Sequence, residues 1–192
     1  MKSALQVALS PARLSARVAS LGRSISRDYA GHTLDVVLIL ENAFIFGADL
    51  VRRISRPMVC HFVRSEMRDV TLGGYVRREI FFSNEPELMG RHVLLVDAVL
   101  HSGVTQDFLL KRLMEGRPRS LRLVVLLDKP QDRKVNLKPD YFGFLGASNP
   151  VAGYGLPGRR GMFRNLPYIG LIREIGRRAG HRARRTAKRP AR

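Results

Sequence analysis

Cysteine, tryptophan and acidic residues are scarce in this chain. Its 192 residues include one cysteine, no tryptophan, and 16 Asp and Glu against 34 Lys and Arg. A single cysteine excludes an intramolecular disulfide framework, which suits a reducing, cytoplasmic compartment. No apolar run is long enough to cross a bilayer, so the sequence predicts no membrane span. Cys60 lies in the apolar run Met58 to Val63, and we expect it to be a buried strand residue, not a nucleophile.

Basic residues give the chain a formal net charge of +18 and are concentrated at its end. Residues 173–192 contain nine Arg and Lys against one Glu. Such a surface attracts polyanions, including nucleic acid and phosphorylated metabolites. The alternative is that these arginines are solvated side chains without a partner, and both interpretations remain open. We expect residues 174–192, which have little apolar content, to form a basic and disordered tail.

Apolar runs alternate with amphipathic segments along residues 1–173, which predicts a single α/β domain. Helices are expected at about 8–29, Ala43–Ile54 and Thr105–Met114. Strands are expected at Leu34–Leu40, Met58–Val63, His92–Val96, Leu121–Leu127, Tyr141–Phe144 and Tyr168–Ile172, with Tyr75–Phe82 as one arm of a hairpin or flap. Apolar strands separated by helices indicate a parallel sheet covered on both faces. Ligands then bind beyond the carboxyl ends of the strands.

The segment from Val93 to Thr105 carries the most informative pattern. An apolar strand ends at Asp97, and a loop of small residues, Ser102 to Thr105, then leads into a helix. Exposed backbone N–H groups, the helix dipole and two hydroxyl groups would form a cup for a phosphate. Asp97 could accept hydrogen bonds from sugar hydroxyls or hold a magnesium ion through water. The alternative is an ordinary strand–loop–helix unit with a capping hydroxyl.

This segment resembles the phosphoribosyl-pyrophosphate motif of type I phosphoribosyltransferases. Four later segments are similar, in order and spacing, to the hypoxanthine-guanine branch of that family: Leu126–Pro130, Lys138–Phe144, Gly153–Leu156 and Phe163–Gly170. The resemblance covers roughly residues 15–172. It implies a Rossmann-like α/β fold, in which a mostly parallel twisted sheet is flanked by helices and carries a small hood and a flexible flap.

The resemblance also implies a reaction and its residues. Such enzymes transfer ribosyl 5-phosphate from phosphoribosyl pyrophosphate to N9 of a 6-oxopurine, with magnesium, and they are commonly homo-oligomers. His101 and Asp97 would be catalytic, and Asp97 would also bind the ribose diol and metal. The implied binding residues are His101, Ser102, Gly103, Val104 and Thr105 for the 5-phosphate, Lys129, Pro150 and Val151 for the purine, and Leu40, Glu41, Asn42 and Arg164 for pyrophosphate.

Several positions depart from the family pattern. The second acid of the motif is Ala98, the base near purine N7 is His101 in place of Asp, and the usual Leu-Lys-Gly loop is Leu40-Glu41-Asn42. The flap pair is Ser65-Glu66, the stacking aromatic is Pro150, and a late Asp falls near Pro157. A histidine can take up or release a proton near neutral pH. We therefore expect a purine phosphoribosyltransferase with an atypical active site. The alternative is a catalytically impaired regulatory protein that binds nucleotide or phosphoribosyl pyrophosphate, with affinity for nucleic acid.

Overall fold

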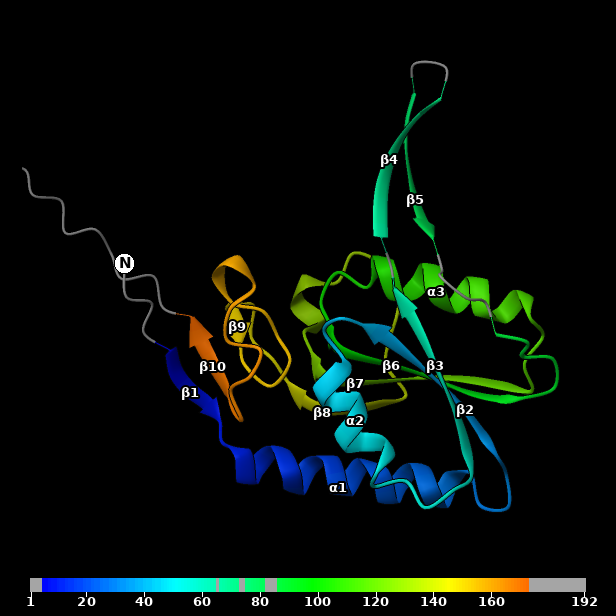
Figure 1. Cartoon of the computed structure of the whole chain (residues 1–192), viewed down its shortest axis with the longest axis horizontal. Coiled ribbons are helices and arrows are strands. Elements are labelled where there is room, and N and C mark those ends of the chain that lie inside the picture. The colour runs from blue at the N-terminus through cyan, green and yellow to red at the C-terminus, as the bar shows by residue number, and fades with distance from the viewer. Residues whose placement is uncertain (1–4, 65, 73–74, 82–85, 173–192) are drawn as a thin grey trace, which may run out of the picture.

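In the computed structural model, a five-stranded parallel sheet forms the centre of the chain (Figure 1). The structure describes residues 5–64, 66–72, 75–81 and 86–172, with the backbone alone for 66–72 and 75–81. The strands lie in the order β3 (Met58–Arg64), β2 (Leu34–Leu40), β6 (His92–Leu100), β7 (Ser120–Asp128) and β8 (Tyr141–Leu145). Every pairing in this sheet is parallel, so the carboxyl ends of the strands share one edge.

Helices cover both faces of this sheet, as its apolar strands require. The helices α1 (Pro11–Asp28) and α2 (Phe44–Val51) pack on one face, and α3 (Val104–Glu115) packs on the other. Alternate residues of β2 serve the two cores. Val36 and Leu38 lie in the cluster that contains α1 and α2, whereas Val37 and Ile39 lie in the cluster that contains α3. The predicted α/β fold is confirmed.

Two smaller antiparallel sheets flank the parallel one. β1 (Leu5–Leu9), β10 (Ile169–Ile172) and β9 (Val151–Ala152) form a hood at one end of the molecule. The hairpin of β4 (Glu66–Leu72) and β5 (Tyr75–Phe81) projects away from the body in Figure 1. Two 3-10 turns, η1 (Pro130–Asp132) and η2 (Arg159–Gly161), complete the elements of the described residues. The predicted hood and hairpin are thus present.

Three expectations from the sequence need correction. The first helix begins at Pro11 with Ser10 as its N-cap, and residues 5–9, partly assigned to that helix, form a hood strand. β6 continues to Leu100, so Asp97 lies inside the strand and not at its end. Cys60 is exposed, not buried, because β3 is an edge strand with exposed apolar side chains, including Val59 and Phe62.

Other expected strands agree closely with the structure. β2 has the predicted bounds, and β7 and β8 extend by one or two residues beyond theirs. Among the described residues, no helix is both long enough and apolar enough to span a membrane. The basic tail, residues 174–192, and the Ser65 position of the flap pair lie outside the described residues.

Candidate active site

The loop before α3 makes a turn that glycine fits best. Gly103 has a φ of +80°, and a Cβ added there would lie 2.8 Å from Cγ2 of Val135. The loop is held from the other side by the N–H of Lys134, which donates to the carbonyl oxygen of Ser102 at 2.9 Å. The first N–H groups of α3 have no partner within the helix, and the helix dipole favours an anion there. Residues Ser102 to Thr105 are therefore a candidate phosphate loop.

Asp97 is a buried carboxylate inside β6, with 6% of its surface exposed. Its Oδ1 accepts the N–H of Ala98 at 2.6 Å, and its Oδ2 accepts the side-chain amide of Gln106 on α3. Burial raises the pKa of Asp97 to about 6, and these hydrogen bonds only partly oppose that rise. Gln106, which sequence reasoning missed, also donates to the carbonyl oxygen of Val99 and joins the strand end to α3.

His101 lies just after β6 and faces a carboxylate that the sequence did not point to. Its Nε2 is 3.1 Å from Oδ2 of Asp132 in η1, although the alignment is not that of a hydrogen bond. Oδ1 of Asp132 accepts the Ser148 hydroxyl at 2.7 Å, which fixes the carboxylate. The His101 side chain is 60% exposed, so a ligand can reach it. The pair gives this position a group that can accept a proton, next to a carboxylate that stabilises the imidazolium.

Two of the three residues expected to bind the purine border a cavity of about 300 Å³ under the hood. Lys129 and Val151 line it, together with apolar side chains of β1, β8 and β10. Lys129 is almost fully buried; burial lowers its pKa, and its Nζ donates to the carbonyl oxygen of Asn149 at 2.9 Å. Pro150, expected to stack on the purine, is exposed and does not line this cavity.

The residues expected to bind pyrophosphate form an ion network after β2. Glu41 contacts Arg64 at 2.6 Å and Arg164 at 3.4 Å, and hydrogen bonding to Arg64 lowers the pKa of Glu41. Arg164 also donates to Oδ1 of Asn42 at 3.0 Å and to the carbonyl oxygen of Gly155 at 2.6 Å. Glu41 is therefore not an isolated repulsive charge, because it partly neutralises Arg64 and Arg164, which lie far apart in the sequence.

One cavity of about 330 Å³ joins most of these groups. Its lining residues are Ile39, Leu40, Glu41, Asn42, Arg64, Asp97, Val99, Thr105, Gln106 and Arg164. The structure thus brings Asp97, Thr105 and the residues expected to bind pyrophosphate together, whereas His101 and residues 102–104 do not line this cavity. The sequence did not point to Arg64 as a site residue, because nothing in the apolar pattern of β3 distinguishes the last residue of that strand. Lys129 and Val151 line the other cavity and not this one.

A magnesium site was expected at Asp97, and the described side chains do not fit one held by protein alone. No group of three or more His, Cys, Asp or Glu side chains that could hold a metal occurs among them. Both carboxylate oxygens of Asp97 already accept hydrogen bonds. Mg²⁺ is usually held by one or two carboxylates together with substrate phosphates.

Comparison with known proteins agrees with this geometry. Residues 10–157 match the phosphoribosyl transferase domain family. The chain belongs to the phosphoribosyltransferase family. It is 36% identical over 174 residues to the hypoxanthine-guanine phosphoribosyltransferase of Mycobacterium avium, covering 86% of this chain and 84% of that protein. This similarity places the chain in the hypoxanthine-guanine branch and confirms the family expected from the sequence.

Further relatives include a longer protein and a solved structure. The chain is 33% identical over 170 residues to the bifunctional protein TilS/HprT of Listeria monocytogenes, and it spans 26% of the length of that relative. A solved hypoxanthine phosphoribosyltransferase from Staphylococcus aureus superposes with a TM-score of 0.79 at 29% identity, covering 88% of this chain and 91% of that one. The Mycobacterium avium and Staphylococcus aureus proteins are both phosphoribosyltransferases by name, in line with the enzyme interpretation of the sequence.

Proposed function

We propose that this phosphoribosyltransferase transfers ribosyl 5-phosphate from phosphoribosyl pyrophosphate to a 6-oxopurine, in cytoplasmic purine salvage. The observation that carries the proposal is the His101–Asp132 pair, in which Nε2 of His101 lies 3.1 Å from Oδ2 of Asp132. His101 directly precedes the candidate phosphate loop, where the reaction needs a proton acceptor. The sequence departs from its family at this position by having histidine, and Asp132 supplies the carboxylate that the motif itself lacks.

The reaction needs three things from this chain. Ser102 to Thr105 would bind the 5-phosphate through backbone N–H groups and hydroxyls. Lys129 would donate to the purine 6-oxo group, and Val151 would meet the base edge with its backbone. The purine N9 forms a bond to C1 of the ribose while the bond from C1 to pyrophosphate breaks. His101 takes the proton that the purine loses, and the Asp132 carboxylate stabilises the imidazolium that results.

The leaving pyrophosphate would be received by cations. Arg164 and Arg64 lie on the same cavity as Asp97, and Arg164 is tied to the segment that follows β2 through Asn42. Two guanidinium groups can take up the charge of a diphosphate in paired hydrogen bonds. Magnesium bound to the substrate diphosphate would neutralise part of its charge, and Asp97 is the residue that would hold the ribose diol or the hydrated ion.

The deciding experiment incubates the full chain with phosphoribosyl pyrophosphate, magnesium and hypoxanthine or guanine, and detects nucleotide by chromatography. We expect nucleotide from at least one 6-oxopurine and a loss of about a hundredfold or more in kcat for His101→Ala, the range expected when an acid–base group is removed. Arg27→Ala, which removes an exposed charge at the end of α1, is the control. Wild-type rates in His101→Ala would contradict the role of His101.

A second function is favoured by one observation. The Glu41 carboxylate contacts both cations that should receive pyrophosphate. A protein that bound phosphoribosyl pyrophosphate or a nucleotide weakly and did not turn it over would have such an arrangement. Binding of pyrophosphate in calorimetry, with no nucleotide formed from any 6-oxopurine, would support this regulatory alternative and contradict the enzyme.

A further inference from the structure

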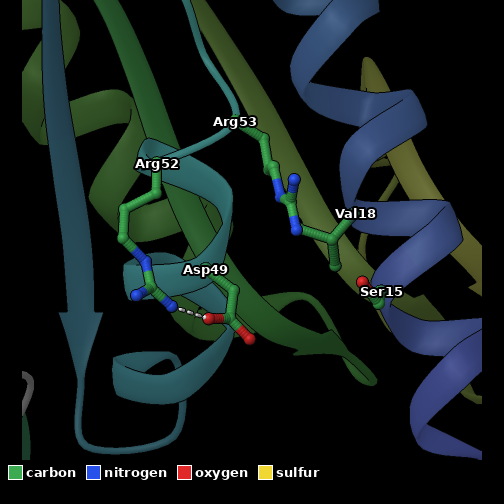
Figure 2. Close-up of a pocket in the computed structure, with 5 residues that line it drawn as sticks. All are labelled: Ser15, Val18, Asp49, Arg52 and Arg53. Atoms are coloured by element: carbon green, nitrogen blue, oxygen red, sulfur yellow. Dashed lines mark hydrogen bonds and ion pairs between the residues drawn. The ribbon is translucent and has the colours of Figure 1, made fainter.

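A groove between α1 and α2 lies outside the candidate active site (Figure 2). Its volume is about 370 Å³, and it is lined by Ser15 and Val18 of α1 and by Asp49, Arg52 and Arg53 of α2 and the turn that follows. Binding sites for small molecules typically measure about 300–1,000 Å³. This groove is at the small end of that range, which suits a sugar phosphate better than a whole nucleotide.

The groove is a built feature of the contact between the two helices. A Cβ added at Gly22 would lie 2.5 Å from both Cβ and the carbonyl oxygen of Arg53, so α1 must carry glycine for the turn after α2 to approach. This contact fixes the backbone of Arg53 at one end of the groove. Figure 2 shows its guanidinium group extending across the space between the helices toward Val18.

The charges in the groove do not balance. Arg52 forms an ion pair with Oδ1 of Asp49 and also donates from Nε to the carbonyl oxygen of Ala48 at 3.1 Å. Oδ2 of Asp49 accepts the Tyr154 hydroxyl at 2.6 Å, so both oxygens of this carboxylate are engaged. Within the part of the chain that the structure describes, the backbone N–H of Arg53 donates to the carbonyl oxygen of Leu50, but its guanidinium group has no hydrogen-bond or ion-pair partner. One guanidinium group therefore remains available to an anion.

We propose that this groove is a second anion site, which binds the phosphate group of a small phosphorylated metabolite. Arg53 donates its paired N–H groups to two phosphate oxygens, the geometry that a guanidinium fork provides. Ser15 on the opposite wall offers a hydroxyl donor. Arg52 turns from Asp49 toward the phosphate, because a dianion competes with a single carboxylate for it.

Asp49 connects this groove to the active site. Tyr154 belongs to the turn in which the N–H of Gly155 donates to the carbonyl oxygen of Arg164 at 2.9 Å, while Arg164 donates back to the carbonyl oxygen of Gly155. A phosphate that draws Arg52 away leaves Asp49 bonded to Tyr154 alone and changes how tightly that turn is held. Occupancy of the groove thus alters anion affinity at Arg164, and the effect is reciprocal. This coupling rests on the proposed role of Arg164, whereas phosphate binding in the groove does not.

The binding is tested by calorimetric titration of inorganic phosphate into the full chain at constant ionic strength. Arg53→Gln should weaken one class of sites by about tenfold, the loss expected from one charge-assisted hydrogen bond. Arg23→Gln removes the same charge from an exposed position of α1 and should bind as the wild type does. Equal losses in both variants would mean that only diffuse positive charge attracts phosphate, and would overturn the site.

A second titration identifies the source of the phosphate. Ribose 5-phosphate bound more tightly than inorganic phosphate, by an amount lost in Arg53→Gln, identifies an organic phosphate. Equal affinity identifies inorganic phosphate, and both outcomes keep the groove as a phosphate site. No saturable binding of either ligand that depends on Arg53 would overturn it. Thermal unfolding of each variant checks that the fold is retained.

The coupling has its own readout. In Tyr154→Phe, phosphate should still bind in the groove, but pyrophosphate affinity should no longer change when phosphate is added. If coupling is absent in the wild type while Arg53→Gln still loses a phosphate site, the link to Arg164 is wrong and the groove stands. If the wild type binds no pyrophosphate at all, it is the proposed function that fails, and the phosphate titration remains decisive for the groove.

Discussion

Two carboxyl groups near β6, those of Asp97 and Asp132, have opposite environments, and the environment decides what each group can do. Asp97 is buried, which raises its pKa to about 6, whereas Asp132 is a partly exposed carboxylate that lies against His101. Burial disfavours the charged form of an acid, so a buried carboxyl group keeps its proton to a higher pH. A carboxylate beside an imidazole can instead stabilise the protonated ring. The first is therefore suited to hydrogen bonding, and the second to supporting proton transfer.

Replacement of Asp132 tests this division. Asp132→Asn keeps the size of the side chain and an acceptor for the Ser148 hydroxyl, but removes the charge beside His101. We expect kcat for nucleotide formation to fall roughly tenfold to a hundredfold, with little change in KM for phosphoribosyl pyrophosphate, because Asp132 is not among the residues proposed to bind the substrate phosphates. Steady-state kinetics measure the split. A change confined to KM would show that Asp132 acts in binding and not in positioning His101.

Asp97 makes stability depend on pH. Its ordinary pKa of 3.8 is raised to about 6 in the folded chain, so between these values the folded state holds a proton that the unfolded state has released. Stability therefore falls as pH rises from about 4 to about 6, by at most about 3 kcal/mol, and then stays level. Asp97→Asn should remove this slope and be more stable than the wild type at pH 7.5 in urea unfolding.

The control for this measurement is Glu115→Gln, which removes an exposed acid from the end of α3. An Asp97→Asn variant that kept the wild-type slope between pH 4 and pH 6 would contradict the burial argument. The same variant should lose activity, because an amide cannot replace the carboxylate toward the ribose or a hydrated cation.

At the scale of elements, apolar runs predicted the strands well where burial is uniform. β2 is buried from Leu34 to Ile39, and its bounds were predicted correctly. The same reasoning located β3 but was wrong about the burial of Cys60, because an edge strand and a central strand can have the same apolar run, and neighbouring strands decide which is exposed. It also ended β6 too early, because a charged Asp97 signals a strand end unless a distant Gln106 satisfies it.

The loop before α3 makes a prediction about an element. Gly103→Ala places a Cβ at a φ of +80° and 2.8 Å from Val135. We expect a loss of about 1–3 kcal/mol in stability from strain and overlap, together with weaker binding of phosphoribosyl pyrophosphate. Gly90→Ala is the matched control, because its φ is +69° and its added Cβ would meet no atom within 4 Å. Equal stability losses would show that conformation alone, and not the contact with Val135, limits this position.

A second prediction at this scale concerns Glu41, in the segment after β2. Glu41→Gln keeps a hydrogen-bonding side chain but frees the charge of Arg64 and Arg164 for an anion. We expect pyrophosphate to bind several-fold more tightly than to the wild type in calorimetry, with the gain shrinking as salt screens the charges. Glu115→Gln, which removes an exposed acid at the end of α3, has the same net charge change. If both variants bind pyrophosphate alike, Glu41 does not compete for these cations.

For the whole molecule, the sequence predicted which segments meet but not which side chains close the site. The family motifs pointed to residues 102–105, Lys129 and Arg164 as candidates, because each motif is continuous in the chain. Asp132, Gln106 and Arg64 reach the site from three separate elements. Their contacts depend on the packing of η1, α3 and β3 against the sheet edge, which no local pattern encodes.

The net charge of +18 leads to the last prediction. The chain from 173 to 192 carries nine Arg and Lys against one Glu, so this segment supplies much of the excess. Deletion of residues 174–192 should weaken binding to single-stranded nucleic acid and flatten its salt dependence, because fewer phosphate contacts release fewer counterions. Nucleotide formation should be unchanged, since none of the residues proposed for the reaction lies beyond Arg164. A gel-shift titration at several salt concentrations measures the first effect, and unchanged affinity in the deletion would assign polyanion binding to the folded domain instead.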